Sequence, residues 1–178
     1  MRPLSLIAVA LLALLALGVA PPDAGVSAGP GLVVAGASLT PGTLTQAQLR
    51  AIGSVSARWT SHGKTHAVQG TPVEALLKSR GWTPGPMGPE VPKVDKRSGY
   101  KKVLIATARD GYQAVFSVAE LTPGMGATRA LIIWSLDGVA LPAESGPLQL
   151  VVLTDGEPSR SLYALERLDL VDPRPPPR

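Results

Sequence analysis

The chain has 178 residues and a formal net charge of +4, and 45% of its residues are hydrophobic and 17% charged. This fits one domain with a hydrophobic core and excludes a chain that is disordered by composition. It contains no cysteine, which excludes disulfides, iron–sulfur clusters, thiol nucleophiles and metals held through a thiolate. With only two histidines, the chain cannot form a His-rich metal site. Its aromatic content of 4% argues against nucleic acid as a partner.

The first 20 residues have the order of a secretory signal peptide, because Arg2 precedes an uncharged apolar stretch at 4–19. That stretch is short for a membrane span. Cleavage is expected after Ala20, Ala24 or Ala28, and an uncleaved N-terminal anchor is the alternative. With no twin-arginine pair, the sequence favours the general secretion route and a periplasmic or secreted protein. No stable membrane span is then expected after cleavage.

Three segments are expected in the exported chain. Residues 21–31 are rich in glycine, proline and alanine and predict a flexible leader. Residues 32–171 form the domain, and 172–178 form a proline-rich tail.

The domain begins with a predicted strand at 32–39, which is apolar and bounded by turn residues. Thr43 and Gln46 have the spacing of a capping box. They predict a short helix that runs through Ile52 and ends at Gly53.

A hairpin follows this helix. Residues 55–60 alternate apolar and polar, which predicts a half-buried strand with Val55, Ala57 and Trp59 facing inward. A turn at 61–64 leads to a returning strand at 65–69.

The next segment predicts a second helix. Thr71 is its expected N-cap, Pro72 its first residue and Glu74 the partner in a capping box, and Gly81 provides a left-handed end. The apolar face of this helix consists of Val73, Leu76 and Leu77.

Residues 83–92 contain four prolines and predict neither a helix nor a central strand. Residues 93–102 add five basic residues. This cluster is interpreted as a solvated loop, and the functional alternative is a clamp for an anion or an acidic partner.

The second half predicts strands joined by Asp-Gly turns at 110–111 and 137–138. Ser117 and Glu120 form a further capping box, which starts one helical turn. The apolar segment 148–153 is expected to be a central strand. The other strands are expected at 103–108, 113–117, 130–136, 139–141 and 165–171. The predicted class is therefore α+β, with a mixed, mostly hairpin-connected sheet and two or three short helices.

Four segments occur in an order that resembles a known family. They are Val68–Leu77 (VQGTPVEALL), Ala108–Tyr112 (ARDGY), Asp137–Pro142 (DGVALP) and Gly146–Val152 (GPLQLVV). Together they resemble the molybdopterin-binding domain of sulfite-oxidase-type oxidoreductases, from about residue 34 to 171. The resemblance implies the α+β fold of that domain and a pterin-shaped cleft.

The chain departs from the family at the position that matters for redox chemistry. Family enzymes hold molybdenum through one cysteine between the first helix and the Gly-x-Pro helix, and the corresponding stretch 54–69 has none. Val68 stands where the family usually has tryptophan. Because a soft thiolate completes that centre, we expect a member without metal ligands or catalytic residues and with no resident cofactor. Bound molybdopterin is the alternative.

Candidate ligand-binding residues were selected by chemistry. Guanidinium groups suit phosphate oxygens, which selects Arg58 and Arg129 as phosphate contacts for a pterin. Arg109 is selected with Tyr112 as a lining residue of the cleft. Tyr112 lies beside Arg109 at a turn. His62 lies four residues before His66 across a turn, a placement more typical of surface histidines than of metal ligands. A serine-hydrolase triad is not expected, because no Gly-x-Ser-x-Gly motif occurs.

The sequence thus predicts an exported, non-redox binding or accessory module for a small anionic ligand or an envelope protein partner. Enzymatic activity is not expected. The alternatives are a molybdopterin-dependent, sulfite-oxidase-like oxidoreductase without a cysteine ligand, and a purely structural envelope protein.

Overall fold

The computed structural model describes residues 31–174. The predicted signal peptide, almost all of the leader and the last four residues of the tail lie outside this range. Within 31–174, no helix is both long and apolar enough to cross a membrane.

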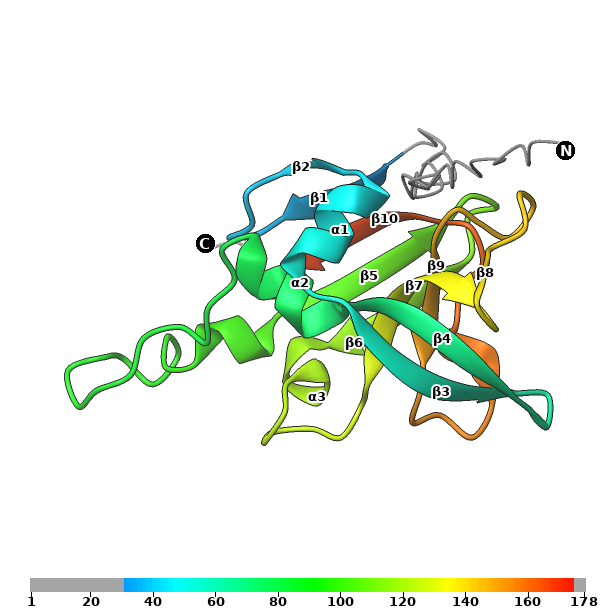
Figure 1. Ribbon diagram of the computed structural model, residues 1–178. Helices are drawn as coiled ribbons and strands as arrows, with labels where there is room; N and C mark the ends of the chain where they lie inside the picture. The colour runs from blue at the N-terminus through cyan, green and yellow to red at the C-terminus, as the bar shows by residue number, and fades with distance from the viewer. Residues whose placement is uncertain (1–30, 175–178) are drawn as a thin grey trace, which may run out of the picture.

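One five-stranded sheet joins the two ends of the domain (Figure 1). Its strands, in spatial order, are β2 (Gly42–Leu44), β1 (Leu32–Gly36), β10 (Leu165–Val171), β5 (Val103–Ala108) and β6 (Gln113–Ser117). β1 and β10 pair in parallel, and the other pairs are antiparallel. The first and last strands of the domain are therefore neighbours inside this sheet.

A second, antiparallel sheet carries the long hairpin in the lower right of Figure 1. Its order is β3 (Val55–Ser61), β4 (Lys64–Pro72), β7 (Ala130–Leu136) and β8 (Val139–Ala140), and β9 (Gln149–Val152) also pairs with β7. The mixed, mostly hairpin-connected α+β fold predicted from the sequence is confirmed.

Three short helices pack on the main core. They are α1 (Gln46–Ile52), α2 (Val73–Ser79) and α3 (Val118–Leu121). The main core also contains buried side chains of both sheets, such as Leu168 of β10 and Ile132 of β7. Two 3-10 turns complete the elements, η1 (Ser98–Lys101) and η2 (Pro158–Arg160).

The second sheet is apolar on both faces. Alternate residues of β7 face the main core, and the residues between them face a smaller cluster. This cluster consists of Trp59, Val68, Leu131, Ile133 and Val151. A sheet that buries side chains on both faces offers a second side on which a site can form.

The start of α1 was predicted two residues too early. The N-cap is Thr45, whose side chain accepts the Gln48 N–H in a complete capping box. Thr43 instead lies in β2, opposite Val33 of β1. Pairing with β1 thus selects the second of two overlapping Thr-x-x-Gln patterns.

The predicted cap of α2 is also wrong. β4 continues to Pro72, and Thr71 lies opposite Ile132 in the ladder to β7. The Thr71 hydroxyl donates to Leu49 O at 2.7 Å and makes no cap. Pro72 ends β4 and is not the first residue of the helix, and Glu74 pairs with Lys78 and makes no capping box. The predicted apolar face is confirmed, since Val73, Leu76 and Leu77 are buried, and Gly81 is left-handed at φ 99°.

Two further expectations fail at the sheet edges. Val55 was expected inside but is 38% exposed, because β3 is an edge strand. β9 was expected to be central, but it forms a ladder with one strand, β7, on one edge alone. Its residues are buried because the segment around Leu162 covers the other edge, with Leu150 and Leu162 exchanging N–H···O bonds of 2.9 and 2.8 Å.

The strand expected at 32–39 ends at Gly36, because residues 37–39 turn away from the sheet with Ser38 left-handed at φ 66°. Two other local predictions agree with the structure. Ser117 and Glu120 form their capping box at α3. Residues 83–92 contain no helix or strand, and the green loop of which they are part projects on the left of Figure 1.

Candidate functional site

A cavity of about 440 Å³ opens beside the smaller apolar cluster. We call it the Trp59 pocket. It is lined by Trp59, Ser61, His62, Lys64, His66, Leu136, Leu141, Pro142, Ser145, Gln149 and Tyr163. The first five of these residues lie in the stretch 54–69, where the family resemblance places its metal-binding cysteine.

Strand alternation explains the polar side of this pocket. Successive residues of a strand point to opposite faces, so Trp59 and Ser61 share one face of β3. The hairpin register sets His66 opposite Trp59 and Lys64 opposite Ser61. Four chemically different side chains therefore meet on one face without any long-range rearrangement.

The deepest of these groups is an indole with an unused donor. Trp59 is 4% exposed, and its Nε1 has no hydrogen-bond partner among the described residues. Leaving a buried donor unpaired costs about 1–3 kcal/mol. The Nε1 atom is itself buried, so the ring lines the cavity while its donor stays shielded from solvent.

A long-range hydrogen bond holds the neighbouring imidazole. His66 Nδ1 lies 2.7 Å from Asp137 Oδ2, and Asp137 Oδ1 accepts the Ala67 N–H at 2.9 Å. The hydrogen bond with His66 lowers the pKa of the Asp137 carboxyl. The sequence analysis treated Asp137 only as a turn residue, and no local pattern signals its partner 71 positions earlier.

The five candidate residues from the sequence do not gather at one place. His62 lines the Trp59 pocket, at the β3–β4 turn. Arg58 is exposed on β3 and points to the face opposite Trp59.

Arg109 and Tyr112 make contacts within the chain. Arg109 Nε donates to Glu166 at 3.0 Å and its Nη2 donates to Gly146 O at 3.1 Å. The Tyr112 hydroxyl donates to Ser159 O at 2.6 Å. These contacts hold the β5–β6 turn against neighbouring segments of the chain, so the polar ends of both side chains already have partners within it.

Arg129 lines a different cavity, of about 550 Å³, next to α2. Glu74 lies in the same wall, and the rest is mostly apolar and small residues. The Trp59 pocket has the denser set of polar groups and therefore the stronger claim to a ligand.

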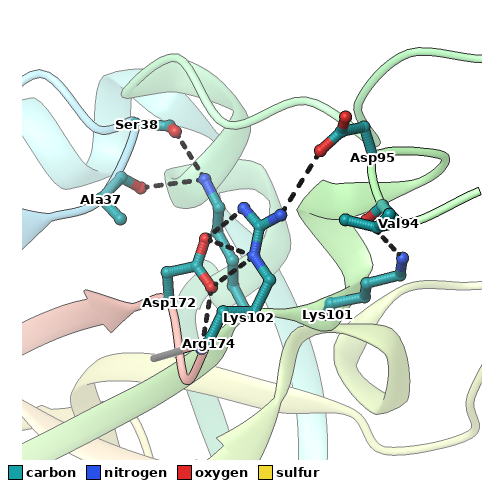
Figure 2. Close-up of polar contacts among 8 residues, drawn as sticks. All are labelled: Ala37, Ser38, Val94, Asp95, Lys101, Lys102, Asp172 and Arg174. Carbon is teal, nitrogen blue, oxygen red and sulfur yellow. Dashed lines mark hydrogen bonds and ion pairs between the residues drawn. The ribbon is translucent and has the colours of Figure 1, made fainter. Parts of the chain in front are cut away.

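The basic segment 93–102 contains a buried lysine that the sequence analysis assigned to the solvated loop. Lys102 is 7% exposed, and its Nζ donates to Ser38 Oγ and Ala37 O. Burial lowers its pKa, against the opposing charge of Asp172. Figure 2 shows this lysine beside the ion pair of Asp172 and Arg174.

Arg174 also reaches Asp95 at 3.5 Å, so the first residues of the predicted tail are tied to the projecting loop (Figure 2). Because these charges pair with one another, the cluster serves to join segments. The anion clamp considered for 93–102 stays a prediction.

The residues of the Trp59 pocket do not fit a thiolate-bound metal. Its polar side chains supply nitrogen and oxygen, and the chain has no cysteine to supply a soft sulfur donor. No group of three or more histidine, aspartate or glutamate side chains within residues 31–174 is arranged to hold a metal ion. The ammonium and imidazole N–H groups suit an anion instead.

Comparisons with known proteins give a likeness of fold. No protein-family model and no curated protein sequence matches the chain. Among solved structures, it is similar to a chain of the sulfane dehydrogenase SoxCD from Paracoccus pantotrophus, with 16% identity and a TM-score of 0.59. The match covers 80% of this chain and 38% of that chain. The chain thus has the fold of part of this dehydrogenase subunit.

Proposed function

We propose that the chain is a non-redox binding module that holds a small anionic ligand in the Trp59 pocket. The observation that carries the proposal is the group of nitrogen-bearing side chains in one wall of the pocket, Lys64, His62 and His66. Hydrogen bonds from charged donors to an anion are among the stronger polar contacts in proteins. No residue of this wall offers the sulfur ligand that a molybdenum centre of the family type needs.

A thermal-shift titration of the purified full chain tests this proposal. Inorganic phosphate, sulfate and phenyl phosphate are each added up to tens of millimolar at constant ionic strength. A ligand present at about 100 times its Kd stabilises the folded state by about 2.7 kcal/mol. For a domain of this size, that raises Tm by roughly 5–10 °C.

Two variants show whether the pocket is the site. Lys64→Ala removes a cation from the wall and should reduce the shift. Lys78→Ala is the matched control, since Lys78 is paired with Glu74 on α2, outside the pocket. The proposal fails when none of the three anions raises Tm, or when Lys64→Ala and Lys78→Ala give equal losses.

A molybdopterin-dependent oxidoreductase without a cysteine ligand is the second candidate. The fold shared with a sulfane dehydrogenase favours it. It requires stoichiometric molybdenum and pterin in the protein isolated from its own cell compartment. Metal analysis and pterin fluorescence after denaturation decide between the two, and finding both at one equivalent would replace the first proposal.

A further inference from the structure

We infer that two adjoining cavities beside α3 form a docking groove for an extended, acidic segment of a protein partner. The inference goes beyond the proposed function, because these cavities and the Trp59 pocket share no lining residue. It follows from the position of the two cavities, their exposed apolar side chains and their arginines.

The two cavities meet at the segment that follows α3. The first has a volume of about 440 Å³ and is lined partly by the projecting loop that contains residues 83–92. The second is the cavity of about 550 Å³ that contains Arg129. Pro123 and Gly124 line both, and α3 lies between the projecting loop and β3 in the view of Figure 1. We call the two together the docking groove.

The second cavity extends the groove to the edge of a sheet. Its wall contains Val55 at the start of β3, Pro72 at the end of β4 and Leu131 near the start of β7. β3 is an edge strand, so one side of its backbone has no strand partner among residues 31–174. An extended peptide can fill both cavities and also pair with such an edge, which a compact small molecule cannot do.

The apolar surface of the groove is unusually accessible. Met87 and Met125 both line the first cavity, and 56% and 49% of their surfaces are exposed. Val55 adds a further exposed apolar side chain in the second cavity. Apolar side chains gathered on one surface are typical of protein-binding sites, and methionine adapts its shape to different apolar partners.

Each cavity also contains an exposed arginine without a carboxylate partner among the described side chains. Arg97 lies in the wall of the first cavity, where its Nε donates to Met87 Sδ at 3.3 Å. Arg129 lies in the wall of the second. Other arginines of the domain, such as Arg109 and Arg160, are paired with carboxylates of the same chain.

The acidic side chains at the groove do not neutralise these two arginines. Glu74 in the second cavity pairs with Lys78 at 2.8 Å. Glu120 accepts the Thr128 hydroxyl and pairs with Arg160 at 3.1 Å. The groove therefore offers its positive charge to a partner. Because the chain itself has a net charge of +4, a second copy is a poor electrostatic match, whereas an acidic segment is complementary.

Selection from a library of random peptides displayed on phage, with the purified full chain as the target, tests the partner chemistry. The enriched sequences should combine acidic residues with large apolar residues. A library that yields no enriched sequence, or enriched sequences without acidic residues, would overturn the inference.

Arginine variants test whether the groove binds an enriched peptide. The labelled peptide is titrated with each protein and its Kd is measured by fluorescence anisotropy. Arg97→Gln and Arg129→Gln should each raise Kd about threefold, and the double variant about tenfold, as expected for exposed ion pairs. The matched control is Arg58→Gln, because Arg58 is exposed on β3 but lines neither cavity. It should change Kd less than about twofold, since salt screens charges outside the contact. Equal effects of the three single variants would overturn the groove.

Methionine methyl NMR then locates the bound peptide. Met87→Leu and Met125→Leu assign the two signals, and the peptide should shift both in a saturable way. Saturable binding that leaves both signals in place would overturn the groove. Shifts that appear with protein concentration alone, together with a dimer in sedimentation, would assign the groove to a second copy and overturn the acidic partner. The proposed function stands under each of these outcomes, because the Trp59 pocket contains no methionine.

Discussion

Substitutions at Thr71 distinguish a helix cap from a bridge between elements. Thr71 is fully buried, and its hydroxyl donates to Leu49 O at 2.7 Å, which joins β4 to α1. The carbonyl of Leu49 otherwise receives the Gly53 N–H at 3.4 Å, longer than an ordinary hydrogen bond. Removal of the hydroxyl therefore leaves a buried acceptor poorly satisfied.

The structure gives a definite order for three variants. Thr71→Ser keeps the donor and loses a methyl group, at about 1 kcal/mol. Thr71→Val keeps the shape and loses the donor, at about 1–3 kcal/mol. Thr71→Asp places a carboxylate beside a carbonyl oxygen in the core, which should cost about 3 kcal/mol or more. If Thr71 were the N-cap of α2, the three variants would rank differently in stability, because aspartate is as good an N-cap residue as threonine.

Urea unfolding followed by tryptophan fluorescence measures these costs, with the m-value checked for constancy. Thr65→Val is the control, because Thr65 is exposed and bonds only to the exposed Thr60 hydroxyl among the described side chains. It should change the free energy of unfolding by less than about 0.5 kcal/mol. If Thr71→Asp unfolds within that margin of the parent chain, the bridge to Leu49 contributes nothing and the reasoning is wrong.

Two further changes test the tail contact and the pairing of β4 with β7. The Arg174 guanidinium lowers the pKa of Asp172 from 3.8 to about 2, so its stabilising contribution is complete above about pH 4 and is lost as pH falls through 2. Acid titrations of stability should show this loss in the parent chain and lack it in Asp172→Asn; identical acid profiles would refute it. Gly70→Ala would place a Cβ 2.5 Å from the backbone oxygen of Ile132 and should destabilise the domain by about 1–3 kcal/mol in thermal unfolding. An unchanged Tm would show that β4 and β7 can separate at no cost.

The sequence predicted the hairpins well because their signals are local. Alternating residues at 55–60 and the dipeptides Asp110-Gly111 and Asp137-Gly138 specify strands and turns within a few positions. The position of the first helix cap could not be found in this way. Thr43 and Thr45 both begin a Thr-x-x-Gln pattern, and pairing of 42–44 with a distant strand selects between them.

The residues of the candidate site were likewise predicted only in part from the sequence. His62 was selected from the sequence and lies in the Trp59 pocket, whereas His66 was assigned to the surface and Trp59 to the core. The residue that orients His66 is 71 positions away, and only the β4–β7 pairing brings the two together. Arg58, Arg109 and Arg129 were chosen for their residue type alone and lie outside the Trp59 pocket. Residue type does not show where strand pairing places a side chain.

The parallel contact between β1 and β10 has a consequence for how the domain reaches its folded state. Leu32 and Val34 of β1 are fully buried, and β10 lies between β1 and β5 and joins them in one sheet. Pairs of strands that are close in sequence, such as β5–β6 and β1–β2, can form as soon as their own residues are available, but the other edge of β1 must wait for the last strand. A chain that emerges amino-terminus first therefore keeps an apolar segment uncovered throughout its emergence, and assembly of the first sheet is a late event that depends on completion of the domain.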